Sequence, residues 1–524
     1  MTDLEQYEQL FDENPIEGSS PLRLIIESND VAALHSYIKK YPDRVFIPTE
    51  MIVDSPFCNA TADETLDVLR VLLDLVDTNG EQIRPVRPDD YSLLDIACGA
   101  AQLNTVKFLL DRSPPLGARY VSDSHGGHAL LSAASSLRCD LSYKADLGPD
   151  GQKIWLRDET ARSEEIIYML LDRGASILDA VRPYRFPHVE QDEKPTDYIE
   201  TALGQAVSRA SYQLVSRLIT EGADVHARQY SWSSDPISDV GEVTALHIAC
   251  GYWNVQGIKA LLDNCGEVSP TDMVSMRDAG GRIPLHWAAQ NICFDDYYLP
   301  DDEIGSQICD TLELLIQTNP KTINAQGKDG ATPLFSAIEG HADCGGTKHF
   351  ERMVQLLCEK GADASIRDIT GQNVLHILAV RTIGCQPVNP SILDLLVAHG
   401  AKVNDADLEG NTPLHHMARS LRQMNLMRRL IHHGANVNVT NNKGETPLHR
   451  AMAALPLARQ NRDGTPDAFT PERRTKAHDE VLEILQGAGC RMDEPNIEGK
   501  TPYQLLEETR ASWRKRDDME ERRK

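Results

Sequence analysis

The chain has 524 residues, too many for one compact core but suited to several domains or to one elongated array. Its 53 Lys and Arg against 79 Asp and Glu give a net charge of −26, which argues against nucleic acid or an anionic membrane as its general partner. No apolar run approaches the roughly 20 residues of a membrane-spanning helix, and the acidic N-terminus lacks the features of a secretory signal. We therefore expect a cytoplasmic or nuclear protein with no membrane partner.

The first segment, residues 1–18, is acidic and places Leu4, Tyr7, Leu10 and Phe11 at helical spacing. This spacing predicts a short helix that caps whatever follows it. A free recruitment motif is the alternative.

A short Pro-Leu or Leu-His segment then recurs along the chain and becomes more regular toward the C-terminus. The faint copies are Ser20-Pro21-Leu22, Ser92-Leu93-Leu94, His128-Ala129-Leu130 and Thr201-Ala202-Leu203. A divergent copy is Thr244-Ala245-Leu246-His247. The clear copies are Ile283-Pro284-Leu285-His286, Thr332-Pro333-Leu334-Phe335, Asn373-Val374-Leu375-His376, Thr412-Pro413-Leu414-His415, Thr446-Pro447-Leu448-His449 and Thr501-Pro502-Tyr503-Gln504. Self-similarity of this kind predicts a repeat architecture.

Two further motifs keep step with this one. A leucine-rich stretch ends in Gly-Ala at Gly174, Gly222, Gly361, Gly400 and Gly434, and a glycine turn precedes several Thr-Pro pairs at Gly330, Gly410, Gly444 and Gly499. Threonine before proline suits a helix start, because the hydroxyl can cap an amide and proline fits the first turn. Glycine suits a helix end or a tight turn. One unit is therefore expected to be helix, loop, helix and projecting turn.

Taken together, the Thr-Pro-Leu-His motif, its phase with Gly-Ala and the 34-residue spacing of Pro413 and Pro447 resemble the ankyrin repeat family. The resemblance implies an all-α ankyrin-repeat solenoid of helix-turn-helix units with short hairpin turns, here ten or eleven of them. It also implies that the repeated histidines, His247, His286, His376, His415 and His449, hydrogen-bond between neighbouring turns rather than act in catalysis.

The expected organisation includes several interruptions. Divergent repeats fill 19–180 with an insertion near 139–162, and 181–199 is a linker or bend near residue 185. Regular repeats fill 200–509 with insertions near 291–307, 340–349 and 454–478, and 510–524 is a charged tail. In the ankyrin fold such interhelical insertions gather at one end of the units, where they are either tolerated loop growth or a partner-specific surface.

The motifs give no catalytic group to single out. Phosphate loops, HExxH helices and GxSxG elbows are absent, as are CxxC pairs among the eleven cysteines, so we expect neither cofactor nor metal. An enzyme or small-molecule pocket formed by the insertions on the repeat scaffold remains the alternative.

We expect instead a protein-interaction scaffold or adaptor whose partner is basic or mixed in charge, bound along the concave surface and the insertion loops. Aromatic side chains are candidate anchors because exposed aromatics dominate many interfaces. Packing between repeats is the alternative for those on the helices, and solvated helix faces are the alternative for the arginines. The candidates are Tyr252, Trp253, Trp287, Phe294, Tyr297, Tyr298, Arg428 and Arg429.

Overall fold

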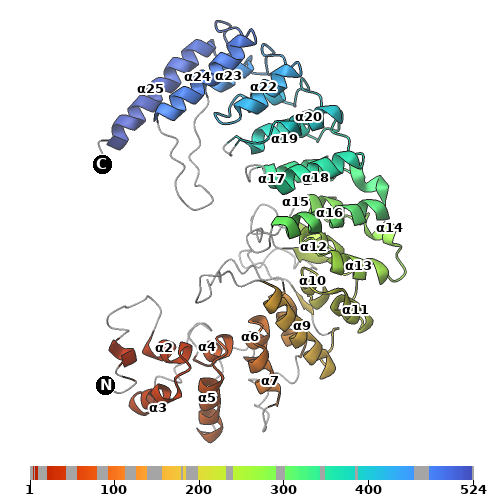
Figure 1. Ribbon diagram of the computed structural model, residues 1–524, viewed down its shortest axis with the longest axis vertical. Helices are drawn as coiled ribbons and strands as arrows, with labels where there is room; N and C mark the ends of the chain where they lie inside the picture. Colours follow the sequence, from red (N-terminus) through yellow and green to blue (C-terminus); the bar gives the residue numbers. More distant parts are fainter. Residues whose placement is uncertain are drawn as a thin grey trace, which may run out of the picture. The chain divides into compact units, whose positions relative to one another are not determined.

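The computed structural model describes most of the chain. The described residues are 4, 6–9, 20–42, 56–79, 93–111, 126–137, 156–178, 181–183, 199–231, 240–290, 301–342, 348–383, 387–453 and 471–521. They form two compact units: Met1–Tyr230 with Gln256–Gly266, and Ser231–Val255 with Glu267–Lys524. Both units are built from successive pairs of antiparallel helices, which confirms the all-α repeat fold (Figure 1).

Unit 1 contains five helix pairs and one further helix within its described residues. The pairs are α2 (Pro21–Glu27) with α3 (Val31–Lys40), α4 (Pro56–Ala62) with α5 (Leu66–Asn79), α6 (Leu93–Gly99) with α7 (Leu103–Asp111), α8 (Gly126–Ser136) with α9 (Leu156–Asp172), and α10 (Ala202–Ala206) with α11 (Tyr212–Thr220). The further helix is α13 (Val255–Asp263), whose first residue belongs to unit 2. First helices pack on first helices, as α2, α4, α6, α8 and α10 do in order.

Short strands supplement this unit. The strand β1 (Val181–Pro183) pairs antiparallel with β2 (Ile199–Thr201), and β2 pairs parallel with β3 (Gln229–Ser231) at Ile199 and Gln229. The ends of the expected linker 181–199 therefore lie in two paired strands.

Unit 2 continues the same arrangement in two rows (Figure 1). Its first helices are α12 (Ala245–Gly251), α15 (Pro284–Gln290), α17 (Pro333–His341), α19 (Val374–Arg381), α21 (Pro413–Met417) and α23 (Pro447–Met452). Its second helices are α16 (Asp301–Thr318), α18 (Lys348–Glu359), α20 (Ser391–Ala398), α22 (Met424–His432) and α24 (Pro471–Gly487). The strand β4 (Val240–Val243), the short helices α14 (Pro270–Met273) and η4 (Pro320–Asn324), and the final helix α25 (Pro502–Glu521) complete it.

The expected helix starts are found in the described repeats. Thr446 and Thr412 occupy the N-cap position with proline at the next residue, and Thr446 accepts a hydrogen bond from the backbone of His449. Their leucines, Leu414 and Leu448, are fully buried. These two repeats therefore begin with a capped helix whose apolar side enters the core shared with its neighbours.

Both ends of the chain make cap-like contacts. Leu4 is buried, and Glu8 forms an ion pair with Lys40 of α3 at 2.9 Å. At the other end, α25 runs through the boundary expected at residue 510, and Trp513 is buried against the ring of His478 on α24. Residues 510–515 thus continue a packed helix rather than starting a separate tail.

Candidate interaction surface

The repeated histidines are buried connectors between neighbouring turns. The backbone N–H of Thr412 donates to Nδ1 of His415 at 3.0 Å, so the ring proton lies on Nε2, which donates to the carbonyl oxygen of Glu445 at 3.0 Å. The same two contacts recur at the four other histidines: His247, His286, His376 and His449. The structural role implied by the family resemblance is therefore what the geometry shows.

Burial keeps these rings neutral. It lowers the pKa of His286, His376 and His415 to about 4 from the ordinary value of 6.5, because a charged imidazolium would lose its hydration in the packed turn. The pKa of His449 is lowered for the same reason. Neutral rings at physiological pH can donate through Nε2 and accept through Nδ1 at once, as the stack requires.

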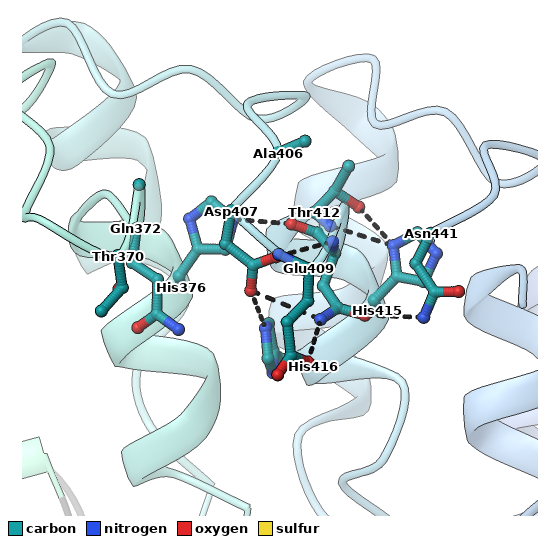
Figure 2. A network of polar contacts seen from close by, with 12 residues as sticks. Thr370, Gln372, His376, Ala406, Asp407, Glu409, Thr412, His415, His416 and Asn441 are labelled. Carbon is teal, nitrogen blue, oxygen red and sulfur yellow. Dashed lines mark hydrogen bonds and ion pairs between the residues drawn. The ribbon is translucent and has the colours of Figure 1, made fainter. Parts of the chain in front are cut away.

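A second polar network fixes the turn before α21 (Figure 2). The buried Asp407 carboxylate accepts from the backbone N–H groups of Glu409 at 2.9 Å and Asn411 at 2.8 Å. It also lies 3.1 Å from Nε2 of His416. Asn441 of the next turn donates to the side chain of Asn411 at 2.9 Å. Successive turns are thus held by side chains as well as by backbone.

The tips of the turns form a backbone ladder through unit 2. At each tip the residue after the first turn position donates its N–H to a carbonyl of the preceding tip, over distances of 2.8 to 3.1 Å. The donors and acceptors are Lys328 to Gly280, Ile369 to Asp329, Leu408 to Thr370, Asn442 to Glu409 and Ile497 to Lys443. Glycine is required beside this ladder: Gly410 has φ of +79°, and a Cβ there would lie 2.9 Å from the backbone nitrogen of Asn442. Backbone hydrogen bonds therefore hold each of these tips against the preceding one.

Three aliphatic side chains project from this ladder into solvent. Ile369, Leu408 and Ile497 are 67%, 72% and 75% exposed, although their backbones are hydrogen-bonded. None of the three is among the contact residues predicted from the sequence. The available signal was an apolar residue directly after the first Asp or Asn of a glycine turn, as in Asp407-Leu408-Glu409-Gly410. We call these three residues the tip row.

Two of the predicted aromatic anchors are packing residues. Trp253 is buried, and its Nε1–H donates to the carbonyl oxygen of Ala288 at 2.7 Å. Trp287 is also buried, and its Nε1–H donates to the carboxylate of Asp278 at 2.8 Å. The expectation that they are exposed contacts is corrected: Trp253 packs against the next repeat, and Trp287 packs between its own turn and His247 of the preceding repeat.

The other predicted aromatics divide into two groups. Tyr252 ends α12 as its C-cap and is half-buried, so part of its side chain reaches the surface. Phe294, Tyr297 and Tyr298 lie outside the described residues.

The predicted arginine pair is compensated by acids of neighbouring repeats. Arg428 lies 3.1 Å from Glu480 of α24, and Arg429 lies 2.6 Å from Asp394 of α20. The guanidinium groups of these exposed side chains bridge second helices, which argues against an uncompensated cationic patch on α22.

The enzyme alternative places its pocket in the insertions, and residues 291–300, 343–347 and 454–470 of these lie outside the described residues. The described helices line one groove elsewhere. A groove of about 950 Å³ lies among α22, α24 and α25, and its lining contains no histidine, cysteine or serine. Arg510 and Asp479 in it form an ion pair. Among the described residues, no group of three His, Cys, Asp or Glu side chains is placed to hold a metal ion.

Stacked helix pairs with projecting hydrogen-bonded tips define a helical-repeat solenoid. The model of the ankyrin repeat family matches residues 203–297, 304–407 and 383–458, and this chain is therefore an ankyrin-repeat protein. Within the described part of the chain, no helix has the length and apolar character needed to cross a membrane.

Similar proteins share parts of the chain. Ankyrin repeat protein nuc-2 of Neurospora crassa is 26% identical over 252 residues, which is 48% of this chain and 19% of that protein. The B-cell lymphoma 3 protein homolog of Mus musculus is 29% identical over 229 residues, 44% of this chain and 42% of the relative. Human transient receptor potential cation channel subfamily A member 1 is 23% identical over 371 residues, 63% of this chain and 29% of the channel. The chain thus spans less than half the length of each of these relatives.

Proposed function

We propose that this chain is a protein-recognition scaffold or adaptor and that its partner binds the tip row, Ile369, Leu408 and Ile497. Ankyrin repeats are in general protein-interaction modules. The observation that carries this proposal is the exposure of three aliphatic side chains on a backbone fixed by hydrogen bonds. Exposed apolar groups without such order would more often be incidental.

Rigid tips make binding efficient. Interfaces lose free energy when loops must become ordered, and the tip ladder removes most of that cost before a partner arrives. Burying a leucine or isoleucine fully contributes about 1.5–3 kcal/mol, so Ile369 and Leu408 together would supply a large part of a micromolar interaction.

The remaining partner contacts follow the sequence expectations. Phe294, Tyr297 and Tyr298 of the insertion near 291–307, with Tyr252, are proposed as a second contact area. A net charge of −26 favours a protein partner that is basic or mixed in charge. We place this activity in the cytoplasm or nucleus.

The test compares substitutions in the tip row with a matched substitution elsewhere. A protein recovered with the full chain is purified, and its affinity is measured by calorimetry for the I369S/L408S variant and for L178S. Leu178 is a fair control, because its side chain is 69% exposed but lies in unit 1.

We expect I369S/L408S to weaken binding by at least about tenfold, since two apolar contacts are lost, and L178S to change it less than about twofold. Equal affinities for all three proteins would refute the role of the tip row. Circular dichroism and urea titration verify that the variants remain folded.

A further inference from the structure

The exposed side chains on the first helices of unit 2 change in character along the row. The helices α19, α21 and α23 pack side by side in that order. Directly after the motif histidine stand Ile377 on α19 and Arg450 on α23. Four residues after it stand Val380 on α19 and Arg419, which follows α21. An apolar surface is therefore followed directly by a cationic one.

The apolar part is formed by α19. Val380 is 37% exposed and Ile377 is half-buried, so both side chains reach solvent. Beside them, Arg381 forms an ion pair with Glu339 of α17, which leaves that side of the surface without net charge.

The cationic part is formed by two arginines, of which Arg450 has an acidic partner and Arg419 has none among the described residues. Arg419 is exposed, and its side chain makes no hydrogen bond or ion pair with any residue that the structure describes. Burial of part of the side chain and the positive charge of Arg450 lower the pKa of Arg419, which indicates that the two guanidinium groups repel each other. Arg450 reaches Glu445 at 3.4 Å through Nη1, while its buried Nε finds no acceptor within the described residues.

The nearby acids do not neutralise Arg419. Asp407 is occupied by His416 and by the backbone of its own turn. Glu445 accepts from Asn441 at 3.0 Å as well as from Arg450. An anionic group brought in by a partner would therefore relieve a repulsion that the described residues do not compensate.

We propose that α19, α21 and α23 form a docking site for an acidic peptide segment of a partner, in which an aliphatic residue contacts Ile377 and Val380 and neighbouring carboxylates pair with Arg419 and Arg450. This inference rests on the proposed recognition function and names the chemistry of one part of it. It also refines the expected partner. The chain as a whole is acidic and favours basic groups, whereas the surface of Arg419 and Arg450 favours acidic groups, so a partner of mixed charge fits both surfaces.

An acidic peptide fits better than a nucleic acid. The apolar surface at Val380 offers no donor to a phosphate backbone, and a chain with net charge −26 repels a long polyanion. A short acidic peptide is attracted by Arg419 and Arg450 and is little repelled by the acidic groups elsewhere on the chain, because charges more than about 8–10 Å apart are screened at physiological salt.

The experiment uses the full chain and a fluorescein-labelled peptide of two leucines followed by four glutamates, read by fluorescence anisotropy. A peptide of reversed order, one with lysine in place of glutamate, and a single-stranded oligouridylate of equal charge are titrated alongside. The variants are R419Q, V380S and the control R352Q. Arg352 is an exposed arginine on the second helix α18, outside the proposed site.

We expect one or both orders of the acidic peptide to bind, with R419Q and V380S each weakening binding about fivefold and R352Q having no effect. The lysine peptide should not bind. Absence of acidic peptide binding, equal effects of R352Q and R419Q, or oligouridylate binding that depends on Arg419 but not on Val380 would each overturn the proposal.

The two proposals fail separately. Loss of peptide binding with a partner still sensitive to I369S/L408S rejects only the acidic site. Peptide binding that depends on Arg419, together with a partner insensitive to I369S/L408S, rejects only the tip row.

Discussion

The buried histidines make the stability of unit 2 depend on pH in a calculable way. His286, His376 and His415 have folded-state pKa values of about 4, whereas an unfolded histidine titrates near 6.5. A lowered folded pKa means that the unfolded chain binds protons more readily as the pH falls. The histidine contribution is thus fully present above about pH 7 and is lost progressively as the pH falls from 6.5 toward 4.

The magnitude follows from the linkage relation. At pH 5.5 each unfolded histidine is about nine-tenths protonated and each folded one is almost entirely neutral, so lowering the pH from 7.0 to 5.5 costs between about 1 and 1.5 kcal/mol per residue. Three residues that unfold together lose about 4 kcal/mol. The result is insensitive to the folded pKa so long as it lies well below 5.5, and side-chain carboxylates remain largely ionised in this window.

Urea unfolding at pH 7.0, 6.0 and 5.5 measures this loss, with tryptophan fluorescence and circular dichroism as readouts. The buried Trp253 and Trp287 report on unit 2. H415Q should remove about 1–1.5 kcal/mol of the loss between pH 7.0 and 5.5, which is the share of one histidine, while His286, His376 and the other buried histidines of lowered pKa still titrate. H432Q, at an exposed position on α22, is the control for the substitution itself.

A free energy of unfolding that stays constant from pH 7.0 to 5.5 would refute the reasoning, because the histidines would then titrate equally in both states. Equal slopes for H415Q and the unaltered chain would also contradict it.

Three further predictions concern stability and are read as urea midpoints. W253A should destabilise unit 2 by about 3–5 kcal/mol through loss of a buried ring and its bond to Ala288, and a neutral result would restore Trp253 as a surface residue. G340A should lower the free energy of unfolding by about 1–3 kcal/mol, because its Cβ would lie 2.1 Å from the carbonyl oxygen of Gln290. G487A, whose Cβ would meet no atom within 4 Å, should be neutral or stabilising by up to about 1 kcal/mol. If G487A were the more destabilising of the two, the result would be inconsistent with the packing of α15 on α17. D407A should lower the free energy of unfolding by about 2–4 kcal/mol, and by more than D368A, because Asp407 contacts the buried His416 as well as the backbone of its turn. Equal losses for the two variants would contradict a stabilising contact between Asp407 and His416.

The helical units could be predicted from sequence because their signals are local. Thr412 before Pro413 determines a helix start, and glycine at Gly410 determines a turn, whatever lies beyond. The role of His415 followed from its recurrence at the same place in each unit, together with the family resemblance.

Exposure could not be predicted in the same way, since it depends on the neighbouring repeat. Trp253 and Trp287 are residue types that often anchor partners, but Trp253 packs against Ala288 of the next repeat and Trp287 against Asp278 and His247. The charges of Arg428 and Arg429 are compensated by Glu480 and Asp394, which lie 52 and 35 residues away in sequence. In the sequence Leu408 resembles an ordinary core residue. Only the structure of the hydrogen-bonded turn shows that its side chain faces solvent.

The central claim, recognition of a partner by the tip row, is tested most directly by site-specific photo-crosslinking. A benzoylphenylalanine is placed at position 369, 408 or 497 of the full chain, and at position 178 as the control, and the partner is added before irradiation. We predict crosslinks from all three tip positions and none from position 178. A partner that still binds each of these proteins but crosslinks only from position 178, or from none of the tip positions, would contradict the claim.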